Sequence, residues 1–413
     1  MESLSDKLKS LGVHFGANKL ASVKPARNEY PIEDVIQGVD FQTHLGNAFL
    51  VEQFLPLDYH QGTGSLYFNN ISLDVLARWA QRPHISLKRP DKFIFLDTET
   101  SGLSGGTGTF VFMIGLGFQS YEGFRLVQLF MRDPGQEMAF LAALNHFINS
   151  FEVVVTFNGK AFDIPLLNTR HVLNGFSSPF KEMDHIDILP LASRIWRNRL
   201  SNRALSNLEI EILGVERTQA EVPGWMIPEL YFEYLRTGDA RPLAGIFYHN
   251  ANDILSLAGL FYYLAKMLGD PSGDPALPGI DMAALARLYE ELEDWITAIQ
   301  LYERSLEQGL PRDFYIQTLS RFASLYRRQG NWDGAIYLWK KAAEQQQIEA
   351  YIELAKYYEH NQRDYIEAIK WTQNALDLAL KTESNPFERI NLMVELNKRL
   401  ERLSNKQNKA GLT

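Results

Sequence analysis

Four acidic residues occupy positions from which they could bind divalent metal ions. Asp97 and Glu99 end the apolar run that begins at Phe93, and residues two apart on an extended chain face the same side. Asp163 opens an expected helix, and Asp253 lies within a long apolar helix. Four carboxylates gathered without Lys or Arg partners would repel one another strongly. Two cations would relieve that repulsion, and oxygen ligands alone select Mg²⁺ or Mn²⁺.

Phosphodiester hydrolysis also needs a base, because two metal ions activate the water and stabilise the leaving 3′ oxygen but do not accept the proton. His249 stands four residues before Asp253, one helical turn away on the same face. Imidazole has an ordinary pKa of about 6.5, which suits a general base at neutral pH. Tyr248, five residues before Asp253, is the competing candidate. We favour His249 because of the helical geometry.

Several of these residues also have a purely structural interpretation. Asp163 could serve only as a helix cap. Asp187, which ends an expected strand, could be an accessory acid at the site or a hydrogen-bond acceptor in the fold. The Gly-rich segment after Glu99 lacks the Lys of a P-loop and precedes no helix, so we expect a hairpin lip rather than a nucleotide site. A basic cluster forms either a solvated helix face or a nucleic-acid contact: Arg194, Arg197, Arg199 and Arg203.

An α/β pattern would position these side chains. Three apolar segments between Phe93 and Met131 are separated by turns, which predicts an antiparallel meander. A helix, a buried strand and further helices follow, ending with a long helix near Gly269. Before the meander we expect one strand around Ala48 to Phe54, added to the sheet edge, and a helix over Ile71 to Ala80.

The composition changes sharply after Gly269. A segment rich in Gly, Pro and Asp predicts a linker there. We therefore expect four regions, which are an N-terminal extension (1–90), an α/β domain (91–269), the linker (270–280) and a helical domain (281–413).

The helical region repeats itself. Three segments with an aromatic residue, a small Ala and a second aromatic residue align at steps of 37 and 33 residues, centred on Ala298, Ala335 and Ala368. These steps bracket the period of about 34 residues of tetratricopeptide repeats. We expect stacked helix pairs whose aromatic residues form the repeat core, and which could bind a protein partner.

The segments DTETSGL, FNGKAFDIPLL and HNANDILSL resemble the three motifs of the DEDD (DnaQ-like) 3′–5′ exonuclease superfamily, which has a ribonuclease-H-like fold. The segments HIDILPLASRIW and LSNLEIEILGVER further resemble a bacterial branch, the YprB-like ribonuclease-H-like domain with a tetratricopeptide tail. The resemblance implies metal binding by the four acids. It also implies substrate contacts around Ser101, Gly102, Leu103 and Asn158.

One feature departs from that superfamily. Its members carry either His five residues before the last Asp or Tyr four residues before it. Here Tyr248 holds the first position and His249 the second, so the usual identities are exchanged.

The composition and charge of the chain exclude several kinds of site and several classes of protein. The chain has 413 residues and no Cys, which excludes thiolate metal sites and disulfides. Lys and Arg number 41 against 50 Asp and Glu, a net charge of −9, unlike a protein that coats nucleic acid with bulk positive charge. Without a signal peptide or long apolar run, we expect a cytoplasmic protein with no membrane partner.

These observations predict a ribonuclease-H-like mixed sheet flanked by helices, followed by an all-α repeat domain. The expected activity is a Mg²⁺- or Mn²⁺-dependent 3′–5′ exonuclease on single-stranded DNA or RNA, using two metal ions. Two alternatives stay open. One is a repeat scaffold with a weak or silent nuclease domain, and the other is a structure-specific endonuclease of the same fold.

Overall fold

A computed structural model describes residues 30–102, 108–215, 217, 222–381 and 386–410. The chain divides into two compact units. The first comprises residues up to 71, 82–190 and 204–264, and the second comprises 72–81, 191–203 and 265 onward. The domain boundaries expected from composition stay a prediction.

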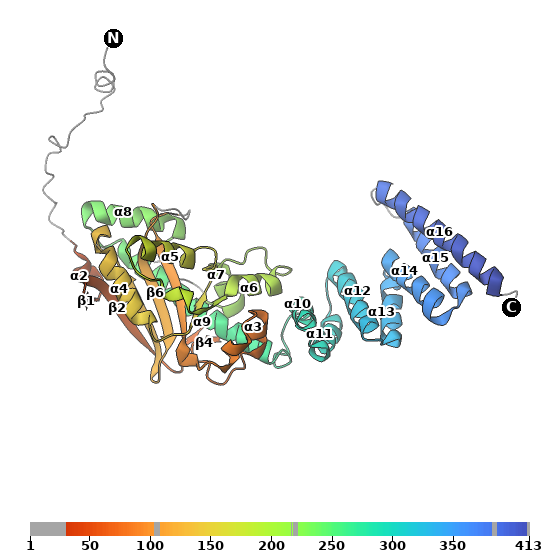
Figure 1. Ribbon diagram of the computed structural model, residues 1–413, viewed down its shortest axis with the longest axis horizontal. Coiled ribbons are helices and arrows are strands. Elements are labelled where there is room, and N and C mark those ends of the chain that lie inside the picture. Colours follow the sequence, from red (N-terminus) through yellow and green to blue (C-terminus); the bar gives the residue numbers. More distant parts are fainter. Residues whose placement is uncertain (1–29, 103–107, 216, 218–221, 382–385, 411–413) are drawn as a thin grey trace, which may run out of the picture. The chain divides into compact units, whose positions relative to one another are not determined.

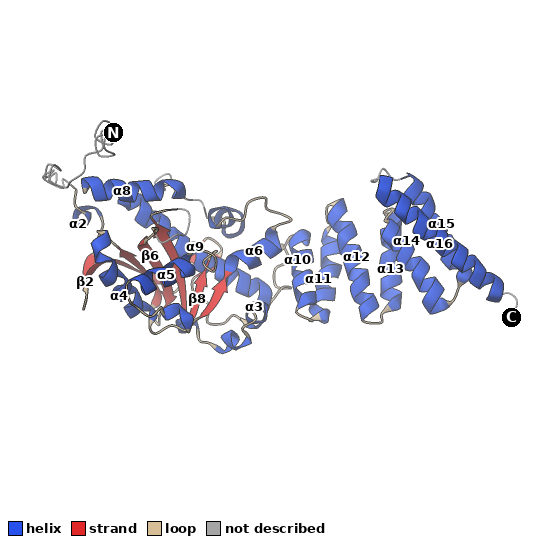
Figure 2. Ribbon diagram, turned by 45° about the horizontal axis from the view of Figure 1, so that its top comes forward, coloured by secondary structure: helices blue, strands red, loops and turns tan. Residues whose placement is uncertain are grey.

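A seven-stranded mixed sheet forms the centre of the first unit (Figure 1, Figure 2). The order is β1-β2-β7-β6-β5-β8-β9, antiparallel from β1 to β5 and parallel from β5 to β9. The strands are β1 (Val39–Thr43), β2 (Gly46–Pro56), β5 (Phe93–Thr100), β6 (Val111–Gln119), β7 (Gly123–Phe130), β8 (Val153–Thr156) and β9 (Asp184–Asp187), with a separate short pair, β3 (His60–Gln61) and β4 (Gly64–Ser65). The expected meander is β5-β6-β7. The strand expected near residue 50 is β2, which extends the sheet beside β7.

Helices pack on both faces of this sheet. They are α2 (Ile32–Val35), α4 (Glu137–Ile148), α5 (Asp163–Leu173), α7 (Leu205–Leu208), α8 (Ile227–Thr237) and α9 (Leu243–Gly269) as far as residue 264, with α6 (Ile188–Trp196) beginning at the end of β9. Phe247 of α9 packs on Phe49 and Phe130, with ring centroids 6.4 and 5.4 Å apart. Phe41 of β1 packs on Phe147 of α4 at 5.4 Å. Because Phe41 pairs with Ala48, the neighbour of Phe49, strand alternation puts α4 on the face opposite α9.

The second unit contains paired helices. They are α10 (Gly279–Glu291), α11 (Trp295–Gln308), α12 (Arg312–Arg328), α13 (Trp332–Glu344), α14 (Ile348–Tyr357), α15 (Tyr365–Lys381) and α16 (Pro386–Ala410), together with α3 (Asp74–Trp79), which the sequence predicted over 71–80. The three aligned alanines, Ala298, Ala335 and Ala368, lie early in α11, α13 and α15 and are fully buried. An Ala at each position lets neighbouring helices approach closely.

The basic cluster after Asp187 is largely occupied within the second unit. Arg194 forms an ion pair with Glu291. Arg199 holds the buried carboxylate of Asp281 at 2.9 Å. Arg203 donates to backbone carbonyls. These contacts favour the structural interpretation of the cluster over a nucleic-acid contact. Across the described residues, no helix combines the length and hydropathy needed to cross a bilayer.

Candidate active site

A row of facing residues crosses the sheet beneath α9. Asp97 in β5 pairs with Gly115 in β6, which pairs with Gln128 in β7, so all three face the same side. A Cβ atom on Gly115 would lie 2.4 Å from Oδ1 of Asn250 in α9. The absence of a side chain at Gly115 therefore lets α9 approach the sheet directly beside Asp97.

Asn250 connects this row to the helix. Its Nδ2 donates to Oδ2 of Asp97 at 3.1 Å, and its Oδ1 accepts from Nε2 of Gln128 at 3.0 Å. Gln128 also donates to the carbonyl of Phe247 at 2.8 Å. Asn250 is fully buried and Gln128 nearly so. Because the N–H and the carbonyl oxygen of this buried amide are both hydrogen-bonded, the amide fixes the orientation of the Asp97 carboxylate.

The acids from β5 and α5 lie together in a buried environment. Glu99 is two residues beyond Asp97, and Asp163 is the first residue of α5. Burial raises the pKa of Glu99 to about 8, and the charge of Asp253 adds to the shift although His249 opposes it. Burial also raises the pKa of Asp163 to about 6, although a hydrogen bond from Thr98 opposes the shift.

The acid from α9 completes the group. Burial, followed by the charges of Asp253 and Glu99, raises the pKa of Asp97 well above its usual range. Asp163 contributes to the same shift. The four carboxylates predicted from the sequence are thus close enough to disfavour one another's ionisation, which is the condition that a bound cation relieves.

His249 lies on the same face of α9 as Asp253, as the spacing predicted. Its Nε2 lies 3.3 Å from Oδ2 of Asp253. Burial lowers the pKa of His249, but the hydrogen bond and charge of Asp253, with Glu99 in addition, raise it to about 9. The imidazole is therefore protonated at neutral pH.

An arginine that the sequence did not single out enters the cluster. Arg217 donates through Nε and Nη2 to the fully buried Glu209, and Nη2 also donates to Oδ1 of Asp253. Its Nη1 lies 3.4 Å from Nδ1 of His249. Burial raises the pKa of Asp253, but His249 and Arg217 outweigh it and lower that pKa below its usual value. The expectation of four acids without an Arg partner is therefore wrong for Asp253.

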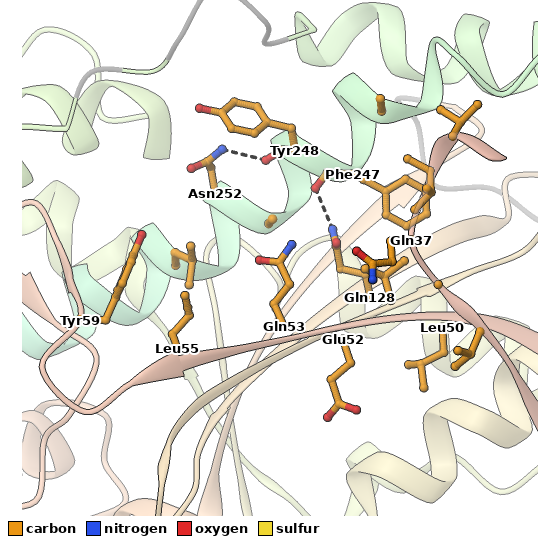
Figure 3. A pocket seen from close by; sticks show the side chains of 18 residues that line it. Gln37, Leu50, Glu52, Gln53, Leu55, Tyr59, Gln128, Phe247, Tyr248 and Asn252 are labelled. Carbon is orange, nitrogen blue, oxygen red and sulfur yellow. Dashed lines mark hydrogen bonds between the residues drawn. The ribbon is translucent and has the colours of Figure 1, made fainter. Parts of the chain in front are cut away.

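Tyr248 points elsewhere. It lines a cavity of about 750 Å³ between α9 and strands β1 and β2, together with Asn252, Gln53 and Tyr59. Figure 3 shows Tyr248 and Asn252 on α9 and Gln53 rising from the strand below. Five residues correspond to well over one helical turn, which separates Tyr248 from the face that carries Asp253.

Asp187 organises the loop before α5. Its carboxylate accepts hydrogen bonds from the backbone N–H groups of Asn158 at 2.8 Å, Lys160 at 3.1 Å and Leu189 at 3.1 Å. Asn158 has a φ of +67°, and its side chain is exposed. A carboxylate holding three backbone donors has a structural role in placing α5, and hence Asp163.

Ser101 and Gly102 lie directly beyond β5, and the expected hairpin lip after them falls mostly on residues 103–107, outside the described residues. The Ser101 N–H donates to the carbonyl of Phe110 at 3.0 Å, and the Ser101 hydroxyl accepts from the Phe110 N–H at 3.0 Å. Gly102 accepts from the Thr100 hydroxyl at 2.8 Å. Both residues are partly exposed, as a surface that contacts a ligand would be. Leu103, the third residue expected here, lies outside the described residues.

The donor set suits a hard divalent cation, since it consists of carboxylates whose crowding raises their pKa values. As the side chains lie, the described part of the chain contains no group of three or more Asp, Glu or His arranged to hold a metal ion. Hydrogen bonds to two of the acids bear on metal binding. Oδ1 of Asp253 is taken by Arg217, and Oδ1 of Asp163 by Thr98. Metal binding would require Asp253 to exchange the guanidinium for the cation.

The chain is similar to several known protein families and proteins. The sequence profile of the RNase H superfamily matches residues 94–265, and that of the tetratricopeptide repeat matches residues 282–313. A profile for a domain of unknown function matches residues 321–402. Among solved structures, a family B DNA polymerase from the hyperthermophilic archaeon Pyrobaculum calidifontis aligns with a TM-score of 0.32 and 16% identity, over 48% of this chain and 29% of the polymerase chain.

The fold is that of a ribonuclease-H-like protein with a tetratricopeptide-repeat region, which confirms the resemblance and the fold class expected from the sequence. The superfamily indicates a nuclease, a hydrolase that acts on nucleic acid. The uncharacterised protein YprB of Bacillus subtilis (strain 168) is 30% identical over 358 residues, 83% of this chain and 84% of that protein. The chain belongs to the YprB family.

Proposed function

We propose that this protein is a 3′–5′ exonuclease that uses Mg²⁺ or Mn²⁺ to degrade single-stranded DNA or RNA. One observation carries the proposal. The carboxylates of Asp97, Glu99, Asp163 and Asp253 come from three separate elements of a nuclease fold and meet in one buried group, with His249 beside them.

The four acids would hold two metal ions, as the resemblance to the DEDD superfamily implies. When bound, such ions lower the pKa of water and stabilise charge on the leaving 3′ oxygen. The protein's own contribution is orientation. Asn250 fixes Asp97, and the hydrogen bonds of Asp187 place the start of α5, where Asp163 lies.

His249 is the proposed general base. Burial lowers the pKa of His249, but the hydrogen bond and charge of Asp253, with Glu99 in addition, raise it to about 9, so the imidazole carries a proton at neutral pH. Neutralising those carboxylates removes this stabilisation and returns the imidazole toward its ordinary pKa of about 6.5. His249 would therefore accept a proton only when bound cations balance the charge of the four carboxylates. Tyr248 faces the separate cavity and is not our choice.

Substrate contacts are proposed for Ser101, Gly102 and Leu103 and for the exposed side chain of Asn158. The repeat region would bind a protein partner. The assay below decides between DNA and RNA.

The test uses 5′-labelled single-stranded DNA and RNA with Mg²⁺, Mn²⁺ or EDTA. The wild type is compared with Asp97→Asn and with Asp239→Asn, a control that neutralises an acid on the surface, where Asp239 pairs with Arg241. We expect a metal-dependent ladder that shortens from the 3′ end and disappears only in Asp97→Asn. Early internal fragments would identify an endonuclease instead. The absence of cleavage on all substrates, without metal binding in calorimetry, would leave the scaffold alternative.

A further inference from the structure

The last described helix carries a concentration of positive charge in a chain that is acidic as a whole. Between Lys398 and Lys409, α16 has five basic residues and one acidic residue, Glu401, in a chain of net charge −9. At 3.6 residues per turn, the five fall within roughly a third of the helix circumference. They are Lys398, Arg399, Arg402, Lys406 and Lys409. We call this surface the basic face of α16.

Three of these cations converge on a single carboxylate. Glu359, whose side chain is fully buried, accepts hydrogen bonds from Arg399 at 3.0 Å, Arg402 at 2.9 and 3.1 Å and Lys406 at 2.8 Å. Burial lowers the pKa of Arg399, although the charges of Glu359, Glu353 and Glu395 oppose that shift. The basic face as a whole has five cations and only Glu401 among them on α16, so it can accept a further anion.

The surface beside the cluster offers a place for that anion. A depression of about 340 Å³ lies along α16 and is lined by Lys398, Glu401, Arg402, Asn405, Lys406 and Lys409. Lys398 and Lys409 are exposed and form no ion pair with another described residue. They lie 11 positions apart, which is about 16 Å along the helix axis. A row of cations over that length matches successive phosphates of a nucleic-acid strand rather than one isolated anion.

We infer that the basic face of α16 binds the phosphate backbone of the nucleic acid on which this nuclease acts. The inference rests on the proposed function, which supplies the reason to choose nucleic acid over an acidic protein segment. Contacts to phosphates carry no sequence information and so would suit an exonuclease that must move along any sequence. The repeat region would then hold the substrate as well as a protein partner.

The test measures binding of the full chain to fluorescently labelled single-stranded DNA and RNA in EDTA, so that no cleavage occurs. The variant is Lys398→Gln/Lys409→Gln, which leaves the contacts to Glu359 intact. The matched control is Lys340→Gln/Lys381→Gln, which removes two exposed charges from α13 and α15. Losing two phosphate contacts should reduce the slope of log K against log[salt] by about 1.4 and weaken binding about tenfold at moderate salt.

Equal losses in the control, or no change in the variant, would overturn the inference. Binding to polyglutamate instead of nucleic acid would also overturn it, in favour of an acidic protein partner. Because binding is measured without metal, the result is independent of the cleavage assay. If the wild type binds nucleic acid through α16 but never cleaves it, the proposed nuclease activity is contradicted and the binding surface on α16 is supported. Cleavage by the wild type together with unchanged nucleic-acid binding in the α16 variant would support the proposed nuclease and contradict this inference.

Discussion

Asn250 and Asp97 are joined by a hydrogen bond of 3.1 Å that connects helix α9 to strand β5. The contact exists because Gly115, opposite Asp97, has no side chain to keep the helix away. The amide is fully buried and also accepts a hydrogen bond from Gln128 on β7, two strands away from β5. The position of one proposed metal ligand thus depends on a residue that would never touch the metal.

The first prediction concerns this amide. Replacing Asn250 with Leu leaves Gln128 with an unsatisfied buried donor, which should lower the free energy of unfolding by about 1 to 3 kcal/mol. Metal-dependent cleavage should fall at least about tenfold, because a carboxylate that has lost its orientation binds the cation poorly. Urea denaturation and the cleavage assay measure the two effects. Asn252→Leu, on the same helix but facing the cavity, should retain its activity, and an equal loss there would refute the explanation.

The second prediction separates the two candidate bases. His249→Gln should reduce the cleavage rate about a hundredfold or more while leaving substrate affinity nearly unchanged, as expected for removal of a general base. Tyr248→Phe should change the rate less than about threefold, since its hydroxyl lies in the cavity with Tyr59. Single-turnover kinetics at saturating metal give both rates. A larger loss in Tyr248→Phe would reverse the assignment.

The third prediction concerns the arginine in the acid cluster. Arg217→Gln leaves the fully buried Glu209 without its cation, which should cost about 3 to 5 kcal/mol of stability. The double variant Glu209→Gln/Arg217→Gln removes both charges and should recover most of that loss. Denaturant titrations of the wild type, both single variants and the double variant close the cycle. Strict additivity would show that the two residues are not coupled.

The fourth prediction is a dependence of stability on pH. Burial, with the charge of Lys160 in addition, lowers the pKa of His185 to about 4. An unfolded chain protonates the same imidazole at a pH of about 6.5. As the pH falls below 6.5, the imidazole becomes protonated in the unfolded state but stays neutral in the folded state. The free energy of unfolding should therefore fall by about 1 to 3 kcal/mol and level off below pH 4. Above pH 6.5 both states are neutral and the effect vanishes.

His185→Gln isolates that contribution from those of the many acids that titrate nearby. The difference in unfolding free energy between the wild type and this variant should be flat above pH 6.5 and slope only between the two pKa values. A difference that stays constant across the whole range would show that His185 does not titrate as described.

Of the four candidate acids, Asp97, Glu99 and Asp163 were predictable because they stand near element boundaries that the sequence marks, whereas Asp253 lies inside α9. Glu99 follows Asp97 on a strand, and Asp163 follows a Gly turn, so their geometry is local. His249 was predictable from its spacing to Asp253 along one helix. Asn250 carried the same signal, because a residue three before Asp253 lies on nearly the same face, yet a single amide in a helix has many other uses.

Arg217 could not be predicted in the same way. Its contacts depend on a segment after the π-helical turn Glu209–Leu213 returning to α9, and no periodicity encodes that return. The pairing of β2 with β7 was similarly hidden. An edge strand can add to either side of a sheet, and only long-range packing selects the side. Asp187 was left with two interpretations because its backbone donors belong to a loop whose shape depends on tertiary contacts.

The origin of the acid cluster in three distant elements has a consequence for synthesis of the protein. Strand β5 and helix α5 leave the ribosome well before α9, which brings Asp253, His249 and Asn250. A growing chain that ends before α9 contains two of the three elements that carry the proposed metal ligands, but it lacks the helix that brings Asp253 to the other acids. Under the proposed function, an enzyme assembled in this order would gain its complete acid group only when most of the first unit has been translated.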